Sequence, residues 1–315
     1  MLKLINNLLD KKTEEKFSLT EIPTESSLFM SDICNFKCKG CRRSVLEMPD
    51  SKMLDVSTVK ATVEKYPSIK SYCIAGQGEP TLNKNFSEII DYLRLKKKIT
   101  FIVTNGSNIE PFLQLKHKPN CISISLYGYD RDSYVSYCGM DVFDRVISNY
   151  KQLRKKFKNV GFSFILNKSN YTSLEKVAEL CDEIKPAFLN LVNYLAYDVS
   201  NAEERDKIIK ITDLEIIEYI ENVCVKRKYI KDKPFYLNPE NKEFCCNSYF
   251  QMLSLDGEGN IGACRSHNVP DESFGNIFNE NDPFNSSKMT EIRRAISEGV
   301  FPEEACQCCF RRQLK

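Results

Sequence analysis

The feature that most constrains this chain is a set of three cysteines separated by three and then two residues. They lie at Cys34, Cys38 and Cys41 in the run CNFKCKGC. Three thiolates at this spacing can ligate one cuboidal iron–sulfur cluster and leave its fourth iron without a protein ligand, whereas a structural zinc site closes its shell with a fourth residue. Taken alone, the spacing leaves a fragment of a zinc site as the alternative. The run therefore predicts a metal centre. If that centre is an iron–sulfur cluster, one of its irons has no protein ligand.

The composition is typical of a soluble protein and indicates no strongly charged partner. The 315 residues include 45 basic and 43 acidic side chains, a net charge of +2. This balance indicates neither nucleic acid nor an anionic membrane as a partner. No window approaches the length of a membrane span, so we expect a cytoplasmic protein. The fourteen cysteines should then be reduced thiols, with clustered ones read as metal ligands and isolated ones as small buried apolar residues.

From residue 28 onward, short β-rich runs alternate with amphipathic segments, the pattern of βα units that build a parallel sheet. We expect strands at 28–33, 71–75, 99–103, 121–126, 160–166 and 187–192, and helices at 56–66, 86–97, 142–157 and 173–184, with a short one through 115. The fold class is therefore α/β, a partial (β/α)6 TIM-like barrel. We expect an N-terminal extension at 1–27, the barrel at 28–200, a linker at 201–234 that contains a helix at 203–225, and a cysteine-rich domain at 235–315.

Chemistry-bearing loops follow the predicted strands at one end. The cysteine loop follows the first strand, the loop Gly76-Gln77-Gly78-Glu79-Pro80 the second, Thr104-Asn105-Gly106 the third and Asn167 the fifth. In parallel sheets, ligand sites collect at the carboxyl ends of the strands. We therefore expect these loops to form one site.

On these motifs the chain resembles the radical S-adenosylmethionine (SAM) superfamily, over roughly residues 28–200. The resemblance implies that the three cysteines hold a 4Fe-4S cluster and that SAM chelates its open iron, which weakens the zinc alternative. It also implies SAM contacts, which are Gly76, Gly78 and Glu79 for the amino group, and Ser123, Ser125 and Asn167 for the ribose and carboxylate. The residue before the third cysteine is often aromatic in this family but is Gly40 here, so Phe36, Arg42 and strand 189–194 stay open as the adenine contact.

The tail holds a second cysteine set. Two short apolar runs flank the turn Asp256-Gly257-Glu258-Gly259, which predicts a β-hairpin, and a helix at 288–297 follows. This part resembles the auxiliary-cluster domain called SPASM, or its shortened form called twitch. The resemblance implies one further 4Fe-4S cluster, held by the cysteines at four positions, namely Cys246, Cys264, Cys306 and Cys309. Cys245 and Cys308 are the alternative ligands, and a zinc ribbon is the alternative site.

The resemblance implies an enzyme. A flavodoxin- or ferredoxin-type protein would reduce the first cluster, SAM would be cleaved to a 5′-deoxyadenosyl radical, and that radical would abstract a hydrogen atom from a polar, sugar-like or aminocyclitol-like substrate. Oxidation and epimerisation both stay open, and Cys138 is a candidate hydrogen donor. A peptide-modifying enzyme is the alternative, and a non-catalytic iron–sulfur carrier or sensor is the alternative from another class.

Basic runs offer a docking hypothesis for the reductant. They lie at 94–98, 154–158 and 226–231. Complementary charge would attract an acidic electron-transfer protein. Solvated helix faces explain the same runs, because acidic residues are interspersed nearby.

Overall fold

Strands and helices alternate from residue 25 in the computed structural model of the chain. The structure describes residues 21–45, 52–240, 246, 248–262, 264, 274–279, 281–300, 306 and 309. The strands are β1 (Glu25–Phe29), β2 (Ser71–Ala75), β3 (Ile99–Thr104), β4 (Cys121–Ser125), β5 (Val160–Leu166), β6 (Leu189–Asn193), β7 (Met252–Leu255) and β8 (Ile261–Gly262). In this part of the chain they form one eight-stranded sheet in the order β6-β5-β4-β3-β2-β1-β7-β8. Strands β1 to β6 are parallel to their neighbours, which confirms the expected partial barrel.

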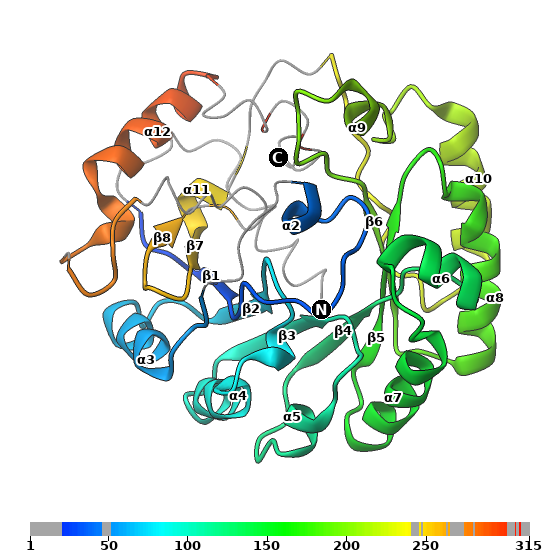
Figure 1. Cartoon of the computed structure of the whole chain (residues 1–315). Coiled ribbons are helices and arrows are strands. Elements are labelled where there is room, and N and C mark those ends of the chain that lie inside the picture. The colour runs from blue at the N-terminus through cyan, green and yellow to red at the C-terminus, as the bar shows by residue number, and fades with distance from the viewer. Residues whose placement is uncertain are drawn as a thin grey trace.

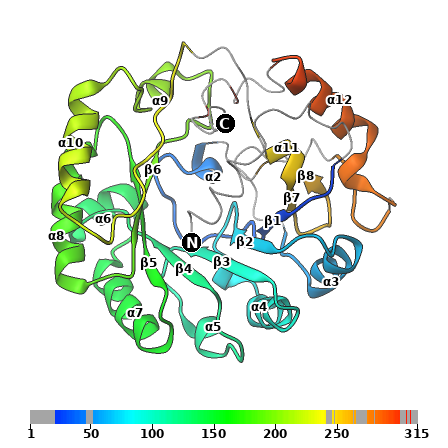
Figure 2. The ribbon, with the colours of Figure 1, turned by 180° about the vertical axis from the view of Figure 1, so that it is seen from behind.

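The helices lie mainly on the outside of the curved sheet (Figures 1 and 2). They are α2 (Arg42–Val45), α3 (Val56–Lys65), α4 (Phe86–Leu95), α5 (Glu110–Leu113), α6 (Arg131–Cys138), α7 (Phe143–Lys156), α8 (Leu174–Ile184), α9 (Ala202–Asp206), α10 (Leu214–Val225), α11 (Ser248–Gln251) and α12 (Ser287–Ser297), with short 3-10 turns at Pro80–Leu82, Tyr171–Ser173 and Pro283–Asn285. Among the described residues, no helix has the length and apolar character needed to cross a membrane.

The two faces of the sheet differ in chemistry. Alternate strand residues such as Ile74, Ile102 and Ile122 are fully buried in one apolar core with the outer helices. The residues between them point to the opposite face, which we call the inner face. There the partly or fully exposed side chains are mixed, with polar or small ones at Cys73, Ser125, Ser163 and Asn190 and apolar ones at Phe101, Val103, Ile165 and Val192. Because alternation places every second residue on this face, the strands present an accessible surface of mixed polarity inside an apolar shell.

The tail is joined to the barrel through the sheet itself. Strand β7 pairs in parallel with β1, with Ser27 opposite Ser254, and β8 turns back antiparallel to β7, which confirms the predicted hairpin. Arg293 of α12 is fully buried and holds the tail elements together. Its guanidinium donates to the carbonyls of Tyr249, at 2.8 Å, and Phe284, at 2.9 Å. Burial lowers the pKa of Arg293 to about 10, and these acceptors offset part of its desolvation.

Some predicted boundaries were wrong. Strand β1 occupies residues 25–29 instead of 28–33, so it begins inside the expected N-terminal extension. The segment 131–138, expected as loop, is helix α6. A capping box at Asp130 and Ser133 starts it, and Gly139, at φ +71°, ends it. The expected helix 203–225 is broken into α9 and α10, because Ile211 donates its backbone N–H to Leu237 at 2.9 Å.

Candidate functional site

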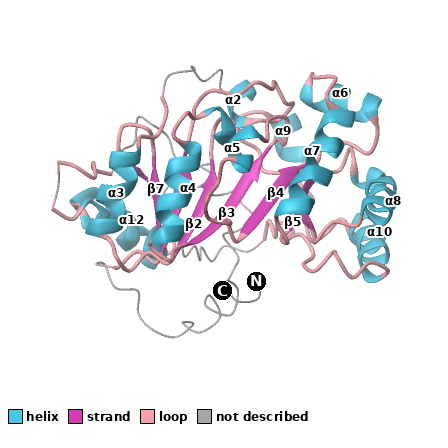
Figure 3. Ribbon diagram, turned by 90° about the horizontal axis from the view of Figure 1, so that it is seen from below, coloured by secondary structure: helices cyan, strands magenta, loops and turns pink. Residues whose placement is uncertain are grey.

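The expected loops meet at one edge of the sheet. The segments after β1, β2, β3 and β5 all leave the carboxyl ends of strands that run in parallel register. Figure 3 shows α2, α6 and α9 along this edge, at the top of the view. The fold therefore brings the cysteine loop, the Gly-Glu-Pro loop and the Thr-Asn-Gly loop together.

The three cysteines of the first loop lie close enough to affect one another's ionisation. Burial raises the pKa of the Cys38 thiol, and the nearby Cys41 and Cys34 raise it further by like-charge repulsion. Burial likewise raises the pKa of Cys34, although the backbone N–H of Phe36 donates to its Sγ at 3.4 Å and opposes this. Thiols with raised pKa values stay neutral unless a positively charged group binds to them, and a metal cluster would supply that charge.

Among the residues that the structure describes, no three His, Cys, Asp or Glu side chains converge so as to hold a single metal ion. The iron–sulfur cluster on Cys34, Cys38 and Cys41 therefore stays a prediction.

Helix α6 supports the cysteine loop from behind. Lys39 donates its backbone N–H to the carbonyl of Tyr137 at 2.9 Å, and Lys37 donates to that of Cys138 at 3.4 Å. Cys138 itself is fully buried, and its Sγ contacts the carbonyl of Met140 at 3.4 Å. Cys138 thus ends helix α6, and its role as a hydrogen donor stays a prediction.

Gly78 is required by the backbone next to it. A Cβ at this position would lie 2.3 Å from the carbonyl oxygen of Ile33 and 2.4 Å from that of Ser31. The next residue, Glu79, donates its backbone N–H to the same Ile33 oxygen at 2.8 Å. Gly76 has φ +147°, and its Cβ would lie 2.9 Å from the Phe29 ring. Both glycines therefore let the Gly-Glu-Pro loop pack directly against the chain that leads into the cysteine loop.

Glu79 ties two loops together. The Glu79 carboxylate is buried. Its Oε1 accepts from the backbone N–H of Thr81 at 3.1 Å, from the Thr81 hydroxyl at 2.7 Å and from the Thr104 hydroxyl at 2.6 Å. Oε2 accepts from the backbone N–H of Asn105 at 2.7 Å. Burial raises the pKa of Glu79, and these four donors oppose that rise. Oε2, with fewer donors than Oε1, keeps the capacity to accept from an ammonium group.

A ring of three side chains connects the cysteine loop to the loop after β3. Asn35 Nδ2 donates to Ser107 Oγ at 2.9 Å, Ser107 Oγ donates to Asn105 Oδ1 at 2.7 Å, and Asn105 Nδ2 donates to Asn35 Oδ1 at 2.8 Å. Asn105 belongs to the loop Thr104-Asn105-Gly106 that was expected at the site, whereas Asn35 and Ser107 were not among the predicted site residues.

The weaker SAM candidates differ in exposure and in hydrogen-bond partners. Ser125 is partly exposed on the inner face. Ser123 is fully buried, and its hydroxyl bonds that of Ser163 at 2.6 Å. Asn167 Oδ1 accepts from the backbone N–H of Ser169 at 2.7 Å, so its side chain forms the turn after β5. Of these candidates, Ser125 is the one whose position suits contact with a ligand.

Tyr194, at the end of β6, fills the space beside Gly40. A Cβ on Gly40 would lie 2.7 Å from the Tyr194 hydroxyl oxygen. That hydroxyl bonds Glu204 of α9, and the ring is 3% exposed. Phe36 is also buried, with its ring 6.1 Å from that of Tyr127. The segment 189–194 thus ends in an aromatic ring next to Gly40, and the adenine contact itself stays a prediction.

The described tail cysteines also influence one another. Burial raises the pKa of Cys246 to about 12, and the nearby Cys264 and Cys309 raise it as well. Cys306 and Cys309 are both buried, and Cys309 donates its backbone N–H to the carbonyl of Cys306 at 3.2 Å. The alternative ligands Cys245 and Cys308 lie outside the described residues. The four preferred cysteines therefore keep their place as the candidate auxiliary site.

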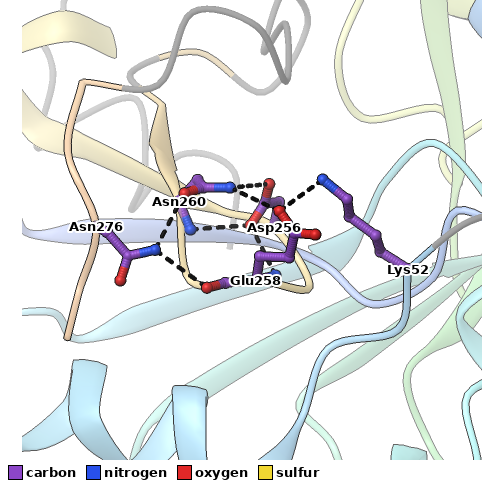
Figure 4. A network of polar contacts seen from close by, with 5 residues as sticks. All are labelled: Lys52, Asp256, Glu258, Asn260 and Asn276. Atoms are coloured by element: carbon purple, nitrogen blue, oxygen red, sulfur yellow. Dashed lines mark hydrogen bonds and ion pairs between the residues drawn. The ribbon is translucent and has the colours of Figure 1, made fainter. Parts of the chain in front are cut away.

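A polar network joins the β7–β8 turn to the segment after the cysteine loop (Figure 4). Asp256 Oδ1 accepts from the backbone N–H groups of Glu258 and Asn260, both at 2.9 Å, and Asn276 Nδ2 donates to Asn260 Oδ1 at 3.0 Å. Lys52 pairs with Glu258 at 2.8 Å, and its carbonyl accepts from the backbone N–H of Asp32 at 2.9 Å. The network therefore connects the tail hairpin to the chain that enters the cysteine loop.

The basic runs lie at the other end of the barrel. Residues 94–98 end α4 and lead into β3, residues 154–158 end α7 and lead into β5, and Tyr229 in the run 226–231 bonds Leu189 at the start of β6. These are the amino ends of the strands, opposite the cysteine loop. Cations at helix carboxyl ends are favoured by the helix dipole, so the structure favours the reading of these runs as solvated helix ends.

Comparison with known families gives a match that covers much of the barrel. Residues 28–181 match the model of the radical SAM superfamily. The probable GTP 3′,8-cyclase of Saccharolobus solfataricus is 28% identical over 267 residues, which cover 77% of this chain and 83% of that protein. The Fe-coproporphyrin III synthase of Methanosarcina barkeri is 28% identical over 161 residues, 50% of this chain and 40% of that protein.

Solved structures share the fold at low identity. Streptococcus suis SuiB bound to S-adenosylmethionine has a TM-score of 0.70 and 17% identity, covering 91% of this chain and 78% of that one. Native anSMEcpe with bound AdoMet has a TM-score of 0.65 and 16% identity, covering 92% and 88%. At such identity, these likenesses establish the architecture.

Proposed function

This chain carries a radical SAM domain at residues 28–181, and we propose that it is an enzyme that removes a hydrogen atom from a small polar, sugar-like substrate and so oxidises or epimerises it. The proposal places the 4Fe-4S cluster on Cys34, Cys38 and Cys41 and SAM against Gly76, Gly78 and Glu79. One observation supports the substrate class, namely the polar, partly exposed side chains of Ser125, Ser163 and Asn190 on the otherwise mixed inner face.

The inner face suits a hydroxylated substrate. Ser125, Ser163 and Asn190 are partly exposed there, and they offer hydroxyl and amide groups that both donate and accept hydrogen bonds. Two neighbouring strands, β4 and β5, place Ser125 opposite Ser163. The curated relative named for GTP also acts on a polar molecule that contains a sugar. A pocket of this kind selects substrates by their hydroxyl groups, since an analogue without them leaves buried polar groups unpaired.

The cofactors divide the work with the chain. When bound, the reduced cluster and SAM supply a 5′-deoxyadenosyl radical, the chemistry that gives the radical SAM superfamily its name. The chain's part is to fix the cysteine loop through α6, to offer Glu79 Oε2 to an ammonium group, and to enclose the substrate within the sheet. Such enclosure keeps a reactive species from side reactions with water or protein.

The tail cysteines bear on the outcome of the reaction. A second cluster on Cys246, Cys264, Cys306 and Cys309 would accept an electron from a substrate radical, which favours oxidation. Epimerisation instead needs a thiol that returns a hydrogen atom, and the candidate for it, Cys138, is fully buried. We therefore propose oxidation as the first reaction to test.

The test is substrate-dependent turnover. Protein purified without oxygen is analysed for iron and sulfide, reduced with dithionite in the presence of SAM, and assayed by mass spectrometry for 5′-deoxyadenosine. Sugars, aminocyclitols and nucleotides, each uniformly deuterated, are then offered in turn. Deuterium in 5′-deoxyadenosine, together with a product two mass units lighter than the substrate when the same compound is offered unlabelled, would support the proposal. Deuterium transfer from peptides alone would favour the peptide alternative, and iron without SAM cleavage would favour a carrier or sensor.

A further inference from the structure

The ring formed by Asn35, Asn105 and Ser107 is closed, which distinguishes it from an ordinary chain of polar contacts. Each side chain donates one hydrogen bond and accepts one within the ring, at 2.7 to 2.9 Å. In addition, Asn105 Oδ1 accepts from the backbone N–H of Ser107 at 2.9 Å. An arrangement in which donors and acceptors all match fixes side-chain orientation, because turning any one amide breaks two bonds.

The ring joins an exposed residue to buried ones. Asn35 is exposed, whereas Asn105 and Ser107 are 4% and 9% exposed. The buried pair is itself held on two sides. Asn105 donates its backbone N–H to Glu79 Oε2 at 2.7 Å, and Asn149 of α7 donates to the carbonyls of Gly106 at 2.9 Å and Ser107 at 3.2 Å. The ring therefore anchors the cysteine loop to the rigid part of the barrel.

Asn35 lies between the first cysteine and Phe36, whose backbone N–H donates to Cys34 Sγ at 3.4 Å. Orienting Asn35 thus orients the peptide that carries this N–H···S bond. We propose that Asn105 and Ser107 are positioning residues which, through Asn35, hold Cys34 in place and slow the loss of the cluster from the cysteine loop. This inference rests on the proposed function, because it assumes that the loop binds a cluster.

Residues behind metal ligands commonly contribute about 10- to 100-fold to metal affinity. We therefore expect Asn35→Ala to lose iron from this cluster about tenfold faster than the unsubstituted protein. Because Asn35 is exposed, this variant should fold normally. Asn35→Asp keeps the acceptor for Asn105 but loses the donor to Ser107, and should give an intermediate rate.

The experiment follows iron release from anaerobic, fully loaded protein into excess ferrous chelator by absorbance. Added SAM slows release from the cluster that it binds, so the SAM-sensitive phase is assigned to the cysteine loop. Asn108→Ala is the matched control, because Asn108 lies in the same loop after β3 but bonds Thr81 and Glu110 instead of Asn35. Its rate should equal that of the unsubstituted protein.

A double variant tests whether the ring acts as one unit. Asn35→Ala combined with Asn105→Ala should lose iron no faster than the worse single variant, since either change already opens the ring. A wild-type rate for Asn35→Ala, or additive effects in the double variant, would overturn the inference. The proposed function fails separately, if the unsubstituted protein binds no iron or does not cleave SAM.

Discussion

Replacement of Gly78 by alanine should disturb the site through a contact that the structure defines. The added Cβ would meet two backbone carbonyl oxygens, of Ile33 at 2.3 Å and Ser31 at 2.4 Å. Real Cβ atoms essentially never approach closer than 3.0 Å, so the shorter contact must lengthen by about 0.7 Å. Neither carbonyl belongs to a flexible side chain. The segment that enters the cysteine loop must therefore move.

The expected cost has two parts. Overpacking of this kind destabilises a folded protein by about 1 to 3 kcal/mol. A displacement approaching 1 Å in a reacting geometry costs about 100-fold in rate. We expect Gly78→Ala to lower the free energy of unfolding by about 2 kcal/mol and SAM cleavage by about 100-fold, because the same shift separates Glu79 from the Ile33 oxygen that it bonds at 2.8 Å.

Two assays measure these effects on anaerobic, cluster-loaded protein, namely urea unfolding and the rate of 5′-deoxyadenosine formation. Gly299→Ala is the control, since its Cβ would meet nothing within 4 Å. That glycine has φ +79°, so the control should lose about 1 kcal/mol of stability from backbone strain and none of its SAM cleavage. Wild-type stability and turnover in Gly78→Ala would refute the steric reasoning.

Three further changes test other parts of the structure. Glu79→Gln should weaken SAM binding about 10- to 100-fold, the worth of one hydrogen bond to a charged group, in a calorimetric titration; unchanged affinity would exclude the ammonium contact. Arg227→Met should cost about 1 to 2 kcal/mol in urea unfolding and leave turnover unchanged, because Arg227 pairs with two partly exposed carboxylates of α8, one of them Asp182. Burial acts to raise the pKa of Asp182, but the hydrogen bonds to it prevail and the pKa is lowered. The stabilisation from Asp182 is therefore present above its unfolded pKa of about 3.8 and is lost as the pH falls below that value. Arg227→Met should flatten this dependence of the free energy of unfolding on acid pH. Cys246→Ala should lower the iron content from about eight to about four per chain, whereas Cys245→Ala should leave it unchanged, and equal loss in both would reassign the ligand.

The βα rhythm carried the prediction of the barrel because buried strands and amphipathic helices leave different periods in the sequence. Strand β2 was predicted at its observed bounds, and helix α3 within one residue. Helix α6 was missed because it is only eight residues long and buries only Tyr134 and Cys138. Its start depends on Asp130 and Ser133, and its end on Gly139, so local capping specifies it more than a buried face does.

Contacts between distant loops were beyond the reach of sequence reasoning. The motifs located Glu79, but its four donors come from Thr81, Thr104 and Asn105, whose contribution depends on how loops fold together. Asn35 carried no periodic or motif signal for its bonds to Asn105 and Ser107. A one-dimensional pattern records which face a residue prefers, whereas partners some 70 positions away are set by the register of the sheet.

The pairing of β7 with β1 means that the tail covers one edge of the barrel sheet. Without β7, the backbone groups of Glu25–Leu28 that face it would become an open strand edge, the kind of surface on which chains associate. A protein cut at residue 234, where the composition of the sequence changes, would therefore expose an unpaired strand edge to which other chains can bind. The cut would not yield an intact, independent domain. Sedimentation of such a shortened chain should reveal self-association, whereas a monodisperse monomer would contradict this view of the tail as a shield.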